Sequence, residues 1–159
     1  MILQNGVTGF TGGNILLDRN WIEVRTLFKK KCYEIISKVG GEIIEWYEPS
    51  IDNGYLHSLC KIDGKELYIF FNSNYDYVAF AKNNNITDLM FIDNDQLAIA
   101  FCDSYRVLTL AELSEPLVFS KTGNKNTLQN PNELNSVELE YTKHFNAQTV
   151  GDLVFNYWD

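Results

Sequence analysis

Few side chains in this sequence have the types and spacing that catalysis needs. His57 and Cys60 come nearest to a base and a nucleophile, but residues three apart on a strand point to opposite faces of its sheet. His144 has no partner close to it in the sequence. The cysteines, which also include Cys32 and Cys102, form no C-x-x-C pair, so neither a disulfide framework nor a zinc site is predicted. We therefore expect no catalytic residues and no metal.

Two pairs of carboxylates have alternative interpretations. Asp93 and Asp95 offer the oxygen ligands that a hard cation prefers, but the glycine and the distal glutamate of a calcium loop are absent. They are predicted to form a turn through bonds to their own backbone. Glu45 and Glu48 would act as an acid and a base only beside a substrate cleft, and the sequence indicates none.

The glycine-rich stretch "NGVTGFTGGN" is similar to the dinucleotide-binding turn of short-chain dehydrogenases, in which glycines let a pyrophosphate approach a helix N-terminus. Only "MILQN" precedes it where a full strand should lie, and no Tyr-x-x-x-Lys pair is present. We predict an entry loop and no cofactor. A small nucleotide-binding enzyme that uses this loop is the alternative.

The formal net charge of −8 is unevenly distributed. Residues 44–118 hold 12 acidic and four basic side chains, whereas residues 18–43 hold six basic and four acidic ones. A negative field of this size repels nucleic acid and anionic membranes and favours a basic protein partner. We expect binding to neither nucleic acid nor membrane.

Tyrosines and acids of the central segment are the predicted contacts for such a partner. Along residues 75–82, Tyr75 and Tyr77 alternate with Asp76, so one strand face could present tyrosines among acids. Tyrosine is enriched at interface hot spots, and carboxylates steer a cationic partner. The alternative is that these tyrosines line the core under a helix. The predicted partner-binding set is Asp52, Tyr75, Asp76, Tyr77, Asp93, Asp95 and Asp103.

A helix is predicted over residues 21–39. Apolar residues recur there at steps of three and four, Asn20 or Asp18 can cap the start, and a glycine pair follows the end. Short strands follow at 42–47, 55–62, 65–71, 75–82, 89–92, 96–102 and 105–110. Asp63-Gly64 predicts a two-residue hairpin turn, since type I′ turns need positive φ at both central positions. Strands joined by tight turns predict an antiparallel meander.

The last third is predicted to contain a helical turn at 111–113 and a polar loop at 120–135. Residues 137–145 fit either a strand with one wet face or a short helix. In "TVGDLVFNYWD", Thr149 and Asp152 form a capping box for a closing helix whose aromatic end, Trp158 included, is expected to plug the core.

The expected fold class is α+β: an antiparallel β-meander sheet with a long N-terminal helix and a short C-terminal helix packed on one face. A length of 159 residues predicts one domain, 1–159. Neither a signal peptide nor a membrane span is visible, so we expect a cytoplasmic protein.

"NGVTGF" near the start and "TVGDLVFNYWD" at the end resemble small cytoplasmic immunity proteins of bacterial polymorphic toxin systems. The resemblance implies a non-enzymatic inhibitor that binds and blocks one basic, nuclease-like toxin domain. No site residue follows from it. A structural or oligomerising accessory protein is a further alternative, and the oligomeric state stays open.

Overall fold

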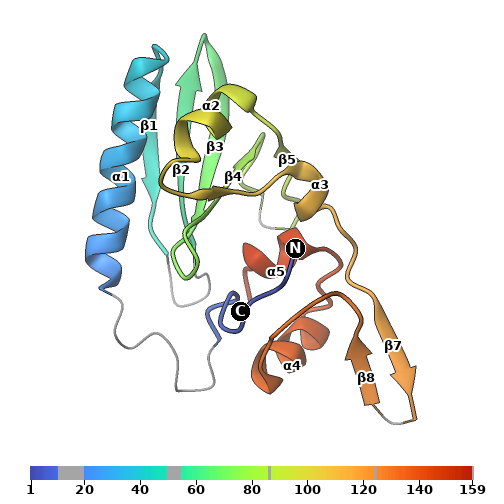
Figure 1. Ribbon diagram of the computed structural model, residues 1–159. Helices are drawn as coiled ribbons and strands as arrows, with labels where there is room; N and C mark the ends of the chain where they lie inside the picture. Colours follow the sequence, from blue (N-terminus) through green and yellow to red (C-terminus); the bar gives the residue numbers. More distant parts are fainter. Residues whose placement is uncertain (11–19, 50–54, 86, 124, 159) are drawn as a thin grey trace.

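The computed structural model describes residues 1–10, 20–49, 55–85, 87–123 and 125–158 (Figure 1). It confirms the α+β class with an antiparallel sheet. The helices are α1 (Trp21–Lys38), α2 (Asp95–Phe101), α3 (Leu110–Leu113), α4 (Ser136–His144) and α5 (Val150–Val154). The strands are β1 (Glu42–Tyr47), β2 (Tyr55–Ile62), β3 (Lys65–Asn72), β4 (Tyr77–Ala81), β5 (Phe91–Ile92), β6 (Arg106–Val107), β7 (Phe119–Thr122) and β8 (Lys125–Leu128).

The main sheet has the order β1-β2-β3-β4-β5, with each neighbouring pair antiparallel. β6 also pairs with β4, but in parallel, which the predicted all-antiparallel meander did not include. β5 pairs with the Phe80 end of β4 and β6 with the Tyr77 end, so two short strands share one edge. The connection from β4 to its parallel partner β6 contains β5 and α2, and it supplies the crossover that a parallel pair requires.

The predicted hairpin turn sets the geometry of the central strands. Asp63 and Gly64 have φ values of 50° and 75°, as a type I′ turn demands. Pairing then runs without a break from Ile62↔Lys65 to Tyr55↔Asn72.

The sheet is apolar on both faces in its middle, and each face has its own cover. The Phe28 ring of α1 stacks on Phe71 with centroids 4.0 Å apart. Phe155, which follows α5, contacts Phe70 at 5.7 Å. Adjacent strand residues point to opposite faces, so α1 and the α5 segment cover opposite sides. The sequence predicted both helices on one face of the sheet. These contacts place them on opposite faces, because β3 carries aromatic residues on both sides and each side needs a cover.

Three segments differ from their predicted structure or resolve an open choice. Residues 95–101 form α2 instead of a strand: Asn94 caps the helix, and Leu97 and Phe101, one turn apart, are buried together. The expected polar loop at 120–135 contains most of the β7–β8 hairpin, which Gly123 turns with φ 62°. Residues 136–144 form a helix, α4.

The closing segment largely follows the sequence pattern. Thr149 and Asp152 make the predicted capping box. α5 ends at Val154, and the chain continues to Trp158, whose side chain is 6% exposed and stacks on Phe145 with centroids 5.7 Å apart. Trp158 is therefore part of the core, whereas Tyr157, which the prediction placed beside it at the aromatic end, is exposed. Among the described residues, no helix has the length and apolar character to cross a membrane.

Candidate functional site

One half-face of the sheet, near the β2–β3 turn, is not covered by any described helix. Cross-strand pairs in an antiparallel sheet point to the same side. One row is therefore Glu45, Leu59 and Tyr68, and the next is Tyr47, His57 and Phe70. A third row, at the end of the strands, is Glu42, Lys61 and Glu66. We call the more accessible members of these rows the open sheet face: Glu42, Glu45, Tyr47, Leu59, Lys61, Glu66 and Tyr68.

The two faces of these strands differ sharply in burial. On the side of α1, Cys60, Leu67 and Ile69 are all buried. On the open sheet face the three carboxylates and the lysine are exposed, and Tyr47, Leu59 and Tyr68 are partly exposed. The α5 segment reaches only the other end of this face, where Phe155 contacts Tyr55 and Phe70. Figure 1 shows α4 and α5 at the end of the sheet away from the β2–β3 turn.

The tyrosines of the open sheet face lie close to its carboxylates. The Tyr47 hydroxyl donates a hydrogen bond of 2.7 Å to Glu45 Oε2, and this bond, with burial, raises the pKa of Tyr47 to about 12. Burial, followed by the negative charges of Glu66 and Glu45, raises the pKa of Tyr68. The Tyr47 and Tyr68 ring centroids are 6.5 Å apart. Two tyrosine rings and two carboxylates therefore form one group on the surface.

His57 lies beside this group, between Tyr47 and Phe70 in one row across the strands. Its ring stacks between Tyr47, at 4.5 Å, and Phe70, at 4.9 Å, both nearly parallel to it. Its side chain is 8% exposed, and its Nδ1 has no hydrogen-bond partner among the described residues. Burial lowers the pKa of His57 to about 4, so the ring is neutral at pH 7. Cys60 packs in the cluster on the other face, as its spacing from His57 predicted.

The carboxylates of the open sheet face form no ion pair within the described chain, although Lys61 lies opposite both Glu42 and Glu66. The ion pairs found there join Lys29 to Glu48, Arg106 to Glu112, and the N-terminal ammonium to Glu115. Lys61 is the one cation of the face, against three acids. The face therefore carries a negative charge that a partner could neutralise.

The predicted tyrosines are partly withdrawn from the surface. Tyr77 is 5% exposed, packs in the core on the α5 side, and lies under the guanidinium of Arg106 at 5.4 Å. This is the core position that the sequence left open as the alternative. Tyr75 is partly buried, stacks on Tyr77, and its hydroxyl donates a hydrogen bond to the Asn5 carbonyl. Asp76 occupies the turn before β4 with φ 54°.

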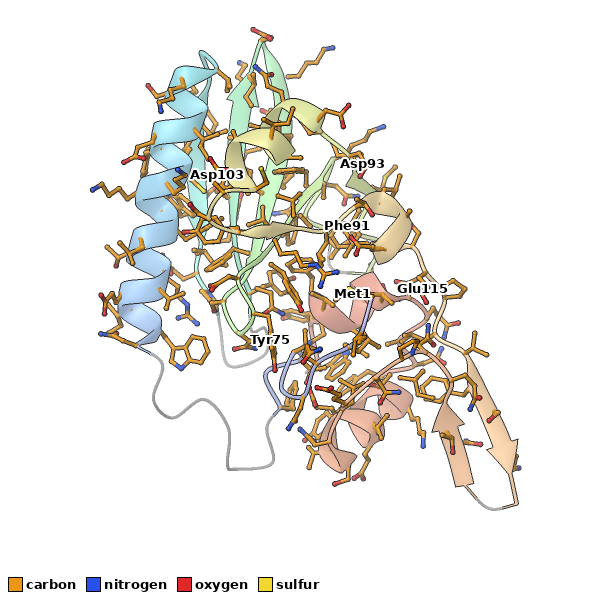
Figure 2. All side chains as sticks on the ribbon, in the orientation of Figure 1. Met1, Tyr75, Phe91, Asp93, Asp103 and Glu115 are labelled. Atoms are coloured by element: carbon orange, nitrogen blue, oxygen red, sulfur yellow. The ribbon has the colours of Figure 1, made fainter. Side chains whose placement is uncertain are left out.

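The predicted acids do not gather around those tyrosines. Figure 2 places Asp93 and Asp103 apart from each other and both away from Tyr75. Asp93 Oδ1 accepts a 2.7 Å bond from the Leu110 backbone N–H, and Asp95 begins α2. Asp103 lines an open hollow of about 770 Å³ beside α2. Asp52 lies outside the described residues.

The backbone donors of the glycine-rich loop bind a side chain of the same chain. Gly6 N and Thr8 N donate to the Glu138 carboxylate of α4, at 2.9 and 3.2 Å, and the Thr8 hydroxyl donates at 2.7 Å. Gly6 and Gly9 both have φ 85°, a conformation that glycine adopts without strain. The backbone donors that would bind a phosphate in a nucleotide loop here bind a buried side chain. Residues 11–14 of the stretch lie outside the described residues.

Histidine, cysteine and acidic side chains form no group that could hold a metal ion in the part of the chain that the structure describes.

Sequence reasoning set Glu45 aside and did not consider Tyr47, Leu59, Glu66 or Tyr68. A signal for three of them was present: a two-residue turn at Asp63-Gly64 places Leu59 opposite Tyr68, and Lys61 opposite Glu66.

Comparisons of the chain with protein-family models, with characterised proteins and with solved structures found no match. The site is therefore interpreted from its own geometry.

Proposed function

We propose that this protein is a non-enzymatic immunity protein of the bacterial cytoplasm, and that it neutralises a basic toxin domain by binding it through the open sheet face. The observation that carries the proposal is the exposed half of an otherwise packed sheet, where Tyr47 and Tyr68 lie among carboxylates that form no ion pair with any described residue. Aromatic side chains supply contact area at interfaces, and tyrosine is frequent among the residues that dominate binding energy.

The charge of the face suits the proposed partner. A nuclease holds its substrate in a basic cleft, and carboxylates can occupy the positions that phosphates would take. Long-range attraction between a chain of net charge −8 and such a cleft accelerates encounter, while the tyrosines slow dissociation once water is excluded. Inhibition then needs no chemistry, because an occupied cleft cannot accept nucleic acid.

The partner in the experiment is the candidate toxin domain, taken as the C-terminal domain of the protein that the adjacent gene encodes, because the resembled immunity proteins are encoded beside their toxins. Stopped-flow association is measured as the NaCl concentration rises from about 50 mM to about 500 mM, a range over which the screening length falls several-fold. We expect the association rate to fall steeply with salt. We also expect Tyr68→Ala to weaken the complex by about 30-fold, the size of a hot-spot residue.

Two variants with equal loss of charge identify the face. Glu45→Gln with Glu66→Gln removes two carboxylates from the open sheet face, whereas Asp95→Asn with Asp103→Asn removes two at the ends of α2. The first double variant is expected to slow association about ten-fold and to abolish protection of cells that express the toxin domain. The second should behave like the parent. A salt-insensitive complex, or equal effects of the two double variants, would contradict the proposal.

A further inference from the structure

The centre of the open sheet face has an apolar floor between two aromatic side chains. Leu59 stands in the same row as Tyr68, next to the row that holds Tyr47. The tyrosine rings are 6.5 Å apart, and all three side chains are partly exposed. A side chain with a long aliphatic stem could lie over Leu59 with its end beside a ring.

The end of that side chain would meet negative charge from two directions. Glu45 shares the Leu59 row, and Glu66 lies two residues from Tyr68 on β3. Both carboxylates act on the Tyr68 hydroxyl through their charge. Neither has an ion-pair partner within the described residues. Tyr47 already donates to Glu45 Oε2, which leaves that carboxylate further lone pairs for a donor from outside.

The neighbouring His57 ring does not oppose a cation on this face. His57 is more than nine-tenths buried and stacked against Tyr47, and its Nδ1 is unpartnered among the described residues. A charged imidazolium there would repel a cation, but burial keeps the pKa of His57 at about 4. At neutral pH the ring next to Tyr47 is therefore polar, aromatic and uncharged.

We propose that the open sheet face seats an arginine side chain of the partner, with the stem over Leu59 and the guanidinium between the Tyr68 ring and the carboxylates of Glu45 and Glu66. This inference rests on the proposed function and adds the chemical group that is recognised. Arginine fits better than lysine because its planar guanidinium stacks on aromatic rings and presents donors to two carboxylates at once. Lysine offers a compact, strongly hydrated charge that gains less from a ring face.

The test compares oligo-arginine and oligo-lysine peptides of equal length, with binding to the full chain measured by calorimetry. Oligo-arginine is expected to bind about two- to five-fold tighter, which is the scale of one cation–π contact at a partly exposed ring. Backbone amide NMR signals of Leu59 and Tyr68 should shift during the titration. The preference should vanish in Glu45→Gln with Glu66→Gln, and also in Tyr68→Leu, while Asp95→Asn with Asp103→Asn should keep it.

Equal affinity for the two peptides, or failure of oligo-arginine to bind, would overturn the arginine seat. Equal weakening by both double variants would also overturn it, because it would indicate attraction to net charge alone. If the toxin domain still binds through the open sheet face while the peptides show no arginine preference, this inference is wrong and the proposed function stands. If the toxin domain does not bind the open sheet face but the arginine preference persists, the proposed function is wrong and the preference of the face for arginine stands. Circular dichroism of each variant separates loss of binding from loss of fold.

Discussion

Replacement of Glu138 is expected to destabilise the protein far more than its position on a short helix suggests. The side chain is fully buried, and its two oxygens accept five hydrogen bonds, from Gly6 N, Thr8 N, Thr8 Oγ1, Asn135 N and Asn135 Nδ2. Glu138→Ala removes every one of these acceptors and leaves buried N–H groups without partners. Each orphaned group costs about 1–3 kcal/mol, and the loss of a buried network of this kind costs about 3–5 kcal/mol in total.

The isosteric variant Glu138→Gln makes the test specific. Oε1 accepts from the Thr8 backbone N–H and Oε2 from the Gly6 backbone N–H, so an amide NH₂ in either orientation would face a donor. We therefore expect Glu138→Gln to lose about 2–4 kcal/mol, although it preserves shape. If the side chain acted by packing alone, glutamine would be nearly neutral.

Urea unfolding followed by tryptophan fluorescence gives the free energies of unfolding directly. The matched control is Glu140→Gln, an exposed glutamate on the same helix, which should change stability by less than about 0.5 kcal/mol. A Glu138→Gln variant that unfolds at the same urea concentration as the parent would refute the reasoning.

Three further predictions, two substitutions and one pH dependence, follow from burial and close contact. Gly151→Ala should destabilise by about 1–3 kcal/mol instead of stabilising α5, because its Cβ would lie 2.7 Å from the Phe91 ring and 3.0 Å from the Leu113 carbonyl; thermal unfolding measures this. Trp158→Ala should cost about 3–5 kcal/mol in the same assay, and an unchanged melting temperature would exclude its role as a core plug. The pKa of His57 is about 4 in the folded protein and 6.5 in the unfolded chain, so between these pH values only the unfolded state binds a proton at this residue. The free energy of unfolding is therefore highest above pH 6.5 and falls as the pH drops toward 4. The loss reaches about 3 kcal/mol; urea midpoints across this range should show it in the parent, and a His57→Phe variant with the same acid sensitivity would assign it to other groups.

Much of the sheet could be predicted because its turn chemistry is local. Asp63-Gly64 fixes a two-residue turn, and a two-residue turn fixes the pairing of every residue in the strands that it joins. The pairing of Leu59 with Tyr68 in one row could therefore be predicted from the sequence. Which face would be covered was not, since β3 carries aromatic residues on both sides and nothing local decides where α1 packs.

The position of Glu45 depends on an irregularity that no local pattern indicated. The register of β1 against β2 shifts between Ile43 and Glu45. Without that bulge, Glu45 would pair with Ser58 and point toward α1, as would Tyr47 two residues later. The bulge turns both residues to the open sheet face. A single inserted residue thus decides whether the proposed site exists.

The segment that became α2 shows how short apolar runs mislead. Residues 96–102 are apolar enough for a buried strand, and periodicity over seven residues does not separate the two structures. The cap at Asn94 was the distinguishing signal, because its side chain accepts from Leu97 N at 3.0 Å. Contacts such as Gly6 with Glu138 were beyond any local pattern, since 132 positions separate the two residues.

The far-separated contacts of the first ten residues affect the order in which the chain acquires structure. Asn156 Nδ2 donates to the Thr8 carbonyl across 148 positions, and Asn72 Nδ2 bridges the carbonyls of Val7 and Val154. On the ribosome the N-terminal segment must wait for residues near the other end, which at about 5–20 residues per second takes roughly 7–30 s. During that interval Leu3 and Val7, which are fully buried in the folded protein, stay exposed to chaperones and to other nascent chains.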